Sequence, residues 1–546
     1  MPAIDVSTHI MMALQIGSIV AVPVTAGLLW LFNRAVVRGM RLSGPSGASS
    51  KGSPTTTDRA AASVKPHEPG GTNAEAEGSV TRVLAVYALA GGAFAITMTA
   101  FMFGSYGYGA NYLSFAYSAS MYAVPWVFAL FAVMPKSRLR WAYLGIYAGL
   151  TALLLAWTVI RNPDILGGIL QVWITSAAVA LLLVAFTLRR LRAAGPLVLA
   201  IVVGAFAGGR IAGELALGST AIFSASLNLW ASLSLPFATF VAAYSPVFGV
   251  LGGLIGIAAG WALLVVIGRR YRRKRFSDQV LFLDTVFAWF AVTYAAQLAV
   301  EGPRWLLAAP AAFLAYKVLA MIGLALVRRK SPPGRRDLLL LRPFSLGRRS
   351  ERLFDSLSKV WLRGGAIHMI AGPDLAVSTV APTDFLAFLS GRMKSRFIRD
   401  EAELAEHLDG LDINPDPDGR YRLNQLYCGD DVWQLAMRAL AARSDVILMD
   451  LRGLTAANQG CLYEIGVLIR GVSLRRVHFA VDATTDRTFL DAAVASLWEQ
   501  LPADSPNRPY GGIASRIVWV EDKPKSRQQL LEALMQPLEA APSTVG

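Results

Sequence analysis

Long apolar runs alternate with short polar segments through the first 330 residues of the chain. An α-helix needs about 20 mostly apolar residues to cross the hydrocarbon core of a bilayer. Runs of about that length lie at residues 10–32, 83–103, 113–134, 141–160, 168–187, 279–299 and 305–327. This half of the chain is therefore predicted to be a polytopic α-helical bundle whose partner is the lipid bilayer.

Clusters of Lys and Arg separate the apolar runs and indicate which side of the membrane each connection faces. Cytoplasmic loops are enriched in Lys and Arg, whereas loops on the opposite side are not. The clusters lie at residues 34–41, 136–140, 189–192, 269–275 and 328–336. We therefore predict a multi-pass protein of the cell (inner or plasma) membrane, with its N-terminus outside and its C-terminal domain in the cytoplasm.

Three further apolar runs, at residues 196–209, 219–240 and 246–268, lie between two of these basic clusters. A segment that begins and ends in the cytoplasm crosses the membrane an even number of times, so one of the three does not span. The stretch around residues 204–230 is interrupted by Gly and Ser, and it is the candidate for a short, re-entrant or interfacial element. The resulting total is about nine spans.

The charge is distributed unevenly between the two halves of the chain. The net charge of the whole chain is +15; residues 1–336 carry +18 and residues 337–546 carry −3. A nucleic-acid-binding domain has a basic surface of its own. The soluble half lacks that excess of Lys and Arg, so we predict no nucleic-acid partner.

Composition also predicts the domain boundaries. Residues 1–42 contain the first transmembrane helix. Residues 43–80 are rich in Gly, Ser, Thr and Pro and are predicted to be a disordered cytoplasmic loop. Residues 81–330 form the multi-span domain. The Pro/Gly-rich segment SPPGRR, at residues 331–336, is predicted to be a hinge before a cytoplasmic α/β domain at residues 337–546.

A few polar residues suggest a function, but each of them also has a simpler structural explanation. Asp284 and Lys317 lie within the last two apolar runs, where ionisable residues suggest function, but we favour a pair between the two helices. Arg210 and Glu214 are four residues apart and can neutralise each other on one helix.

The cysteines and histidines indicate no metal site. The two cysteines, Cys428 and Cys461, are predicted to be free thiols in a reducing compartment. Cys461 is predicted to be a packing residue of its helix. A role as a nucleophile is the less favoured alternative. His368 is interpreted as a core residue within a strand.

From residue 337 onward, short apolar runs alternate with helical patterns. Strands are predicted at residues 337–344, 366–372, 395–398, 444–453, 475–482 and 515–520, and helices at 349–362, 383–394, 431–443, 459–470, 487–500 and 526–538. Such alternation predicts a mostly parallel, flavodoxin-like sheet covered by helices on both faces. The stretch at residues 407–422 is predicted to be a loop.

Open parallel sheets bind ligands beyond the carboxyl ends of their strands, where the strand order reverses. Two predicted strands end in polar residues. Arg342, Phe344 and Ser345 follow the first strand, and Asp450 and Arg452 end the strand at residues 444–453. These five residues are candidate ligand contacts, with a solvated or mutually paired strand end as the alternative for Asp450 and Arg452. The chain has no GxGxxG and no Walker lysine motif.

The segment SDVILMDLRGLTAANQGCLYEIGVLI, at residues 444–469, resembles the Toll/interleukin-1 receptor (TIR) domain and the related nucleoside deoxyribosyltransferase-like fold. In both, a strand–loop–helix unit presents a glutamate to the ribose of a nucleotide. The Cys-x-x-Glu spacing of many TIR domains is present as Cys461 and Glu464, whereas the usual Trp before the Cys is replaced by Gly460.

The resemblance implies that Glu464 is the catalytic residue and that Asn458 contacts the ligand. It implies hydrolysis of the ribosyl–nicotinamide bond of NAD or a related nucleotide, with NAD as substrate and no resident cofactor. It also implies a stress or defence signalling role and a homo-oligomer formed through the cytoplasmic domain.

A carboxylate can stabilise the oxocarbenium-like transition state of such a reaction, as carboxylates do in glycosidases. The alternative for Glu464 is a favourable interaction with the positive end of its helix. Two other functions remain open: a TIR-like sensor or interaction module without catalysis, and a transporter or channel with a regulatory cytoplasmic domain.

Overall fold

A computed structural model describes the helices and strands of the chain. The described residues are 6–42, 73–107, 109, 111–134, 138–161, 163, 167, 191, 194–329, 335–342, 348–371, 380–429, 432–502, 505 and 507–536. The chain divides into two compact units. The first comprises Met1–Trp30, Leu84–Val133 and Arg138–Gly323, and the second comprises Leu31–Val83, Met134–Ser137 and Leu324–Gly546.

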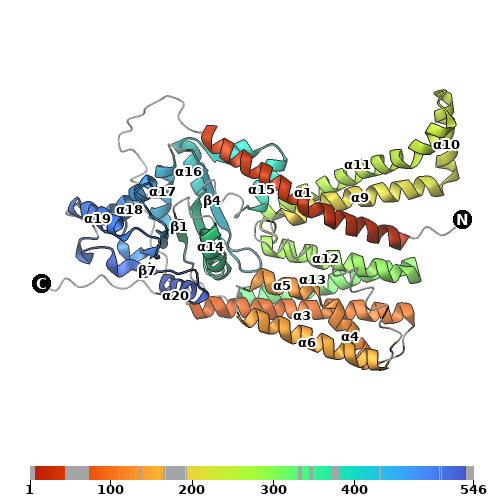
Figure 1. Cartoon of the computed structure of the whole chain (residues 1–546), viewed down its shortest axis with the longest axis horizontal. Coiled ribbons are helices and arrows are strands. Elements are labelled where there is room, and N and C mark those ends of the chain that lie inside the picture. The colour runs from red at the N-terminus through yellow and green to blue at the C-terminus, as the bar shows by residue number, and fades with distance from the viewer. Residues whose placement is uncertain are drawn as a thin grey trace. The chain divides into compact units, whose positions relative to one another are not determined.

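The N-terminal half of the chain is helical (Figure 1). Its α-helices are α1 (Val6–Leu42), α3 (Asn73–Tyr106), α4 (Tyr112–Tyr122), α5 (Pro125–Val133), α6 (Arg138–Arg161), α9 (Gly195–Gly218), α10 (Thr220–Ser232), α11 (Phe237–Arg272), α12 (Asp278–Leu298) and α13 (Ala308–Arg329). Two short 3₁₀ helices, η1 (Ala299–Glu301) and η2 (Pro303–Leu307), connect α12 to α13.

Seven helical segments among the described residues are long and apolar enough to cross a membrane: Leu14–Met40, Gly78–Tyr106, Arg138–Arg161, Gly195–Gly218, Phe237–Arg272, Asp278–Glu301 and Pro303–Arg329. The pair α4–α5, bent by 46° where the two helices meet, brings the number to eight if it forms one span. These helices are compatible with a multi-pass membrane protein. The predicted span at residues 168–187 lies outside the described residues.

The stretch with three apolar runs contains two helices of membrane-crossing length, α9 and α11. Between them, α10 has 13 residues, too few to cross a bilayer. The short element predicted around residues 204–230 is therefore α10, although the first part of that range continues α9 as far as Gly218.

Close helix packing joins α9 to α11, which run side by side in Figure 1. A Cβ atom placed on Gly208 would overlap the carbonyl oxygen of Gly252, and one placed on Gly256 would overlap that of Gly204. Only Gly allows two helix backbones to approach so closely, as in other small-residue interfaces of membrane helices.

A polar contact links α12 to α13 within the apolar bundle. Lys317 forms an ion pair with Asp284, and the Tyr316 hydroxyl donates a 3.1 Å hydrogen bond to the other carboxylate oxygen of Asp284. The predicted pairing of Asp284 with Lys317 is therefore confirmed. The ring of Tyr316 also stacks on Phe287, with 3.8 Å between the ring centroids.

The C-terminal half of the chain contains a seven-stranded parallel sheet in the order β3-β4-β2-β1-β5-β6-β7. The strands are β1 (Leu338–Leu341), β2 (Ile367–Ile370), β3 (Phe397–Ile398), β4 (Leu423–Cys428), β5 (Val446–Asp450), β6 (Val477–Val481) and β7 (Ile517–Trp519). The predicted parallel sheet is confirmed.

Helices separate most of the strands: α14 (Arg348–Trp361), α15 (Pro382–Leu389), α16 (Glu401–Asp409), α17 (Trp433–Arg443), α18 (Gln459–Gly471), α19 (Arg487–Glu499) and α20 (Pro524–Met535). The 3₁₀ helices are η3 (Met393–Arg396), η4 (Leu474–Arg476), η5 (Arg508–Tyr510) and η6 (Ala514–Arg516). The sequence pattern predicts neither α16 nor β4, and α16 occupies the first residues of the predicted loop at 407–422.

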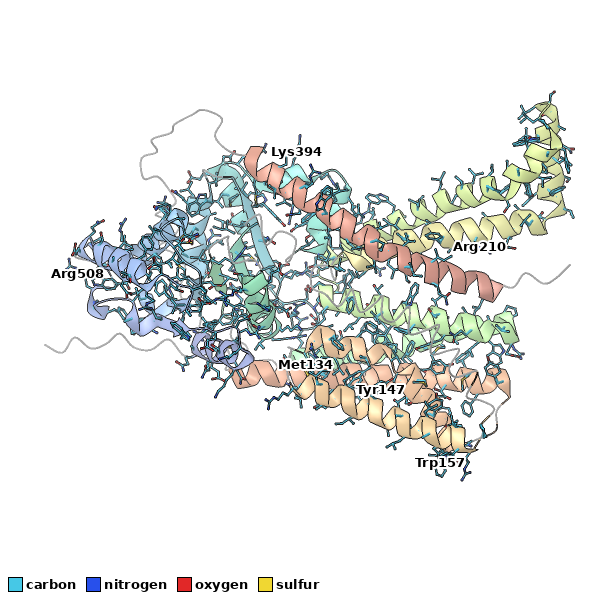
Figure 2. All side chains as sticks on the ribbon, in the orientation of Figure 1. Met134, Tyr147, Trp157, Arg210, Lys394 and Arg508 are labelled. Atoms are coloured by element: carbon cyan, nitrogen blue, oxygen red, sulfur yellow. The ribbon has the colours of Figure 1, made fainter. Side chains whose placement is uncertain are left out.

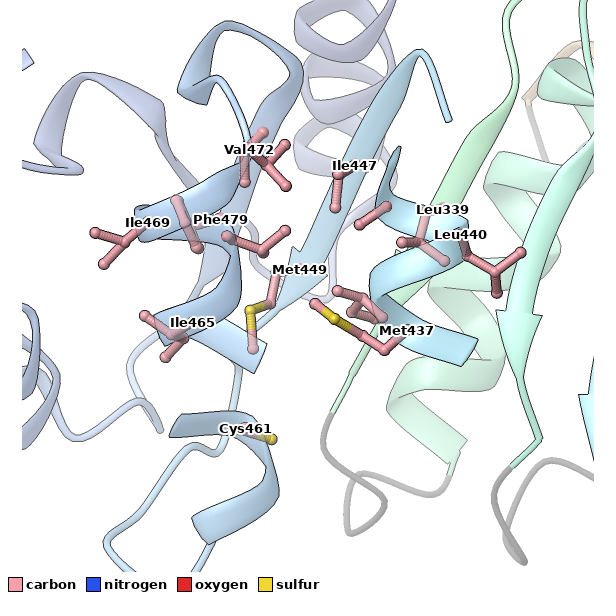
Figure 3. Packing of buried hydrophobic residues seen from close by; sticks show 14 of the residues in the cluster. Leu339, Met437, Leu440, Ile447, Met449, Cys461, Ile465, Ile469, Val472 and Phe479 are labelled. Carbon is pink, nitrogen blue, oxygen red and sulfur yellow. The ribbon is translucent and has the colours of Figure 1, made fainter. Parts of the chain in front are cut away.

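Apolar side chains cover both faces of the sheet. On one face, α16, α17, α18 and α19 pack against the strands; on the other, α14 and α20 do so. Figure 3 shows Met449 of β5 between Met437 of α17 and Ile465 of α18. The central strands are thus buried on both sides, which explains their continuous apolar sequence.

The residues just before β1 belong to the sheet domain. The Arg336 side chain donates hydrogen bonds of 3.1 and 2.9 Å to the carbonyl oxygens of Met535 and Gln536, at the end of α20. Arg335 forms a 2.8 Å ion pair with Asp337. Both arginines are therefore held by the folded domain, while residues 331–334 of the predicted hinge lie outside the described residues.

Candidate functional site

The strand order reverses between β1 and β5. The chain passes from β1 to β2 on one side and returns to β5 on the other, and β1 pairs directly with β5, Leu341 opposite Met449. The residues that follow these two strands therefore emerge side by side at the same edge of the sheet. This edge is where an open parallel sheet is expected to bind a ligand.

Arg342 directly follows β1 and is 5% exposed. Because Leu341 pairs with Met449, Arg342 enters the site next to Asp450. The other candidates from this loop, Phe344 and Ser345, lie outside the described residues.

Asp450 and Arg452 form a buried pair at the end of β5. The Arg452 Nε donates a 2.8 Å hydrogen bond to Oδ1 of Asp450, and its Nη2 donates one of 2.7 Å to Oδ2. Both residues are 1% exposed. Burial acts to lower the pKa of Arg452, but the carboxylate of Asp450 and then those of Asp482 and Asp522 raise it above its ordinary value. The paired alternative considered for these two residues is the one observed.

The loop after the pair is fixed by hydrogen bonds. Gly453 has φ of +69°, a left-handed conformation that favours Gly. The next residue, Leu454, donates from its N–H to the Leu451 carbonyl oxygen at 3.0 Å. Asn458 precedes α18, and its Oδ1 accepts hydrogen bonds of 2.9 and 3.1 Å from the N–H and hydroxyl of Thr455. Asn458 therefore closes the loop rather than capping α18 with its side chain.

Glu464 is the sixth residue of α18 and lies on its buried face with Cys461 and Ile465. It is 8% exposed, and its Oε2 is buried with no hydrogen-bond partner among the described residues. Burial raises the pKa of Glu464 to about 8, while the positive charge of Arg342 acts in the opposite direction. A buried carboxyl oxygen without a partner is costly, and such groups call for an explanation in ligand binding or catalysis.

Two other candidates are structural. Cys461 is 6% exposed, and burial, helped by the charges of Glu464 and Asp450, raises its pKa to about 12. Its thiol therefore stays protonated, as the packing interpretation requires. His368 lies near the start of β2, with Nε2 3.5 Å from Oδ2 of Asp337, at the opposite end of the strands from Glu464.

A second set of charged residues at this edge was missed from the sequence. Asp482 follows β6 and lies 3.5 Å from the guanidinium group of Arg349, at the start of α14. Asp482 Oδ1 also accepts a 2.6 Å hydrogen bond from the Thr484 hydroxyl. The signal was present in the sequence, because Asp482 directly follows an apolar strand as Arg342 follows β1.

Within the described part of the chain, the site combines a buried carboxyl oxygen that has no hydrogen-bond partner, Oε2 of Glu464, with the positive charge of Arg342 nearby. No group of His, Cys, Asp and Glu among the described residues is arranged to hold a metal ion. The carboxyl group can accept hydrogen bonds from ligand hydroxyl groups, and when ionised it can stabilise a neighbouring positive charge.

The chain matches no protein-family model, and searches of curated proteins and of solved structures find no significant match. The resemblance to TIR domains thus depends on the residues of this chain alone.

Proposed function

We propose that the C-terminal domain binds NAD or a related nucleotide and hydrolyses its ribosyl–nitrogen bond, with Glu464 as the catalytic residue. The observation that supports this most is the buried Oε2 of Glu464, which has no hydrogen-bond partner among the residues that the structure describes and lies on the helix that follows β5 at the strand-order reversal. A buried polar atom without a partner lowers the stability of the folded protein. A role in binding or catalysis can explain why the protein keeps such a group.

In this reaction the bond between ribose C1′ and the base nitrogen breaks, and its electron pair leaves with the base. The oxygen of a water molecule bonds to C1′, and the proton that water loses passes through the Glu464 carboxylate to solvent. The ionised carboxylate faces the positive charge that develops on the ribose ring, and this is the transition-state interaction that lowers the barrier.

Ligand binding must ionise Glu464 for this role. A pKa of about 8 leaves the carboxyl group mostly protonated at neutral pH when no ligand is bound. A cationic nicotinamide ring next to the carboxyl group favours its charged form, as Arg342 already does. The turnover rate at low substrate concentration is therefore expected to rise with pH up to about 8.

The test is NAD turnover by the purified full chain in detergent, followed by nicotinamide release. Glu464→Gln keeps the side-chain shape but removes the charge, so the rate should fall by roughly two to four orders of magnitude. Glu499→Gln, at the exposed end of α19, is the matched control and should leave turnover unchanged. Equal rates for wild type and Glu464→Gln would reject the catalytic role.

Binding without turnover would instead support a TIR-like sensor that passes a nucleotide signal to the membrane domain. The proposed biological setting is stress or defence signalling, with homo-oligomers formed through the cytoplasmic domain. Solute or ion flux in vesicles containing the full chain would favour the transporter or channel alternative.

For the membrane half we propose about nine spans in the cell membrane, with the N-terminus outside and the C-terminal domain in the cytoplasm. The distribution of basic clusters supports this orientation. Reporter fusions after residue 60, after Arg192 and after Arg275 should report the cytoplasm, and a fusion after Gly109 should report the opposite side. Opposite results for Arg192 and Arg275 would overturn the proposed number of crossings.

A further inference from the structure

The C-terminal end of α11 carries a dense cluster of arginines. Arg269, Arg270, Arg272, Arg273 and Arg275 lie within seven residues, and all five are exposed. Among the residues that the structure describes, none of the five has an acidic partner within ion-pair distance. Positive charges this close together repel one another, so anionic groups from outside the chain stabilise the cluster.

The cluster lies where an uncharged segment of membrane-crossing length ends. The 20 residues before it, 249–268, contain no Asp, Glu, Lys or Arg. At 1.5 Å per residue such a segment extends about 30 Å, which is the thickness of the hydrocarbon core of a bilayer. When α11 spans the membrane, the arginines are therefore at the level of the lipid headgroups.

An exposed apolar face of α11 leads directly into the cluster. Near its end, Val265 and Val266 are 36% and 43% exposed. Four of the arginines follow these two valines at spacings of four and seven residues. Residues at these spacings lie on the same face of a helix. The same face continues toward the N-terminus of α11 with exposed Leu251, Leu254 and Ile255.

The opposite side of this part of α11 is buried. Tyr271 is 5% exposed and follows Leu264, which is 1% exposed, by seven residues. Gly268 lies on the buried side as well. In Figure 2, α11 runs beside α9, on which Arg210 is labelled. The helix end thus packs through Tyr271 and presents the arginines to its surroundings.

An anionic phospholipid matches both parts of this face. Its acyl chains fit the exposed apolar side chains, and its phosphate group fits the arginines that follow them. Guanidinium groups bind phosphate through paired hydrogen bonds. Dense clusters of Lys and Arg next to a transmembrane helix attract anionic lipids. A zwitterionic lipid offers the same phosphate together with a positive group, so the cluster attracts it less strongly.

We propose that the C-terminal end of α11 is a binding site for anionic phospholipid, with the acyl chains along the face that contains Val265 and Val266 and the headgroup phosphate on Arg269, Arg270 and their neighbours. The proposal rests on the placement of α11 across the membrane. It is independent of the nucleotide chemistry proposed for Glu464.

The experiment uses the full chain, reconstituted in phosphatidylcholine vesicles that contain a trace of spin-labelled phosphatidylglycerol or spin-labelled phosphatidylcholine. Electron paramagnetic resonance measures the fraction of each label that the protein immobilises. The wild type should immobilise the phosphatidylglycerol label at least about threefold more strongly than the phosphatidylcholine label. Salt at about 1 M shortens the screening length to about 3 Å and should remove most of this preference.

Two double variants locate the preference on α11. Arg269→Gln with Arg270→Gln, and Arg272→Gln with Arg273→Gln, each remove two guanidinium groups. Each should lower the preference by at least about twofold. The arginines that remain keep this end of the helix basic, and unchanged melting in detergent shows that each variant is folded.

The matched control is Arg438→Gln with Lys525→Gln, two exposed positions of the sheet domain. It changes the net charge of the chain by the same amount and should leave the lipid preference unchanged.

Three results would overturn the proposal. The wild type could immobilise both labels equally, or its preference could persist in both double variants, and either result would mean that α11 does not select anionic lipid. Immobilisation of neither label would mean that the chain does not lie in the bilayer, which would also reject the placement across the membrane.

Discussion

The guanidinium group of Arg452 meets the carboxylate of Asp450 through two parallel hydrogen bonds, 2.8 Å from Nε to Oδ1 and 2.7 Å from Nη2 to Oδ2. Each side chain is 1% exposed, and Asp450 is the carboxylate that acts most strongly on Arg452. The pair joins the last residue of β5 to the loop that leads into α18, and therefore supports the helix that carries Glu464.

Removing one member of the pair should be strongly destabilising. Asp450→Asn leaves the buried charge of Arg452 without its counter-ion, which typically costs about 3–5 kcal/mol. Hydrogen exchange of the full chain, read at peptides from β5 and α18, should show much faster opening than in the wild type. The double variant Asp450→Leu with Arg452→Met removes both charges and should recover most of the protection. Equal exchange in the wild type and Asp450→Asn would contradict a stabilising pair.

The buried carboxyl group of Glu464 predicts a pH-dependent loss of stability. Its folded-state pKa of about 8 lies above the ordinary value of 4.5, so between these two values the folded state holds the proton more tightly than the unfolded state. Stability from this group is present below pH 4.5 and is lost as the pH rises to about 8. Glu464→Gln cannot ionise and should become progressively more stable than the wild type across this range.

Thermal melting of both full-length chains from pH 5 to pH 9 tests this expectation. The informative quantity is the difference between the two melting temperatures at each pH, because other groups titrate equally in both chains. A difference that does not change with pH would show that Glu464 is solvated rather than buried.

The contact between α9 and α11 predicts that Gly208 tolerates no side chain. A Cβ at this position would overlap the backbone oxygen of Gly252, which cannot rotate away. Gly208→Ala should therefore lower stability by about 1–3 kcal/mol, measured by thermal melting in detergent. Gly92→Ala is the control, because no atom lies within 4 Å of a Cβ there. Equal melting of the two variants would argue against the close helix contact.

The ion pair between Asp284 and Lys317 predicts coupling between two substitutions. Asp284→Asn leaves Lys317 without its partner, and Lys317→Met leaves the carboxylate with the hydroxyl of Tyr316. The combined variant should lose less stability than the two single losses together, by about 0.5–3 kcal/mol. Strictly additive losses would show that the pair contributes no mutual stabilisation.

The features that the sequence predicts well depend on local pattern. The long helices follow from the lengths of their apolar runs, and β5 follows from VILMD, a buried strand with a polar end. In contrast, β4 has the sequence LNQLYC, in which polar residues alternate irregularly with apolar ones. Its position between β3 and β2 is set by tertiary pairing, which no local pattern encodes.

The candidate site, like the fold, was predictable from the sequence only where local pattern determines it. The two strand ends that meet there were predicted from their residues, whereas their adjacency follows from the pairing of β1 with β5. The burial of Glu464 is predictable in part from the sequence. The spacing of one helix face is shared by Cys461, Glu464, Ile465 and Leu468. That its Oε2 has no hydrogen-bond partner among the described residues depends on side chains from other elements and was not predictable.

The position of β1 in the middle of the sheet also has a consequence for synthesis. Its neighbour β5 begins 105 residues after β1 ends, which corresponds to about 5–20 s at ordinary rates of translation. During that interval one edge of the apolar strand LLLL has no partner, and the unpaired edge of such a strand readily joins another chain. The nascent domain is therefore most vulnerable to aggregation before Val446 leaves the ribosome, and a chaperone that binds apolar segments should act in that interval.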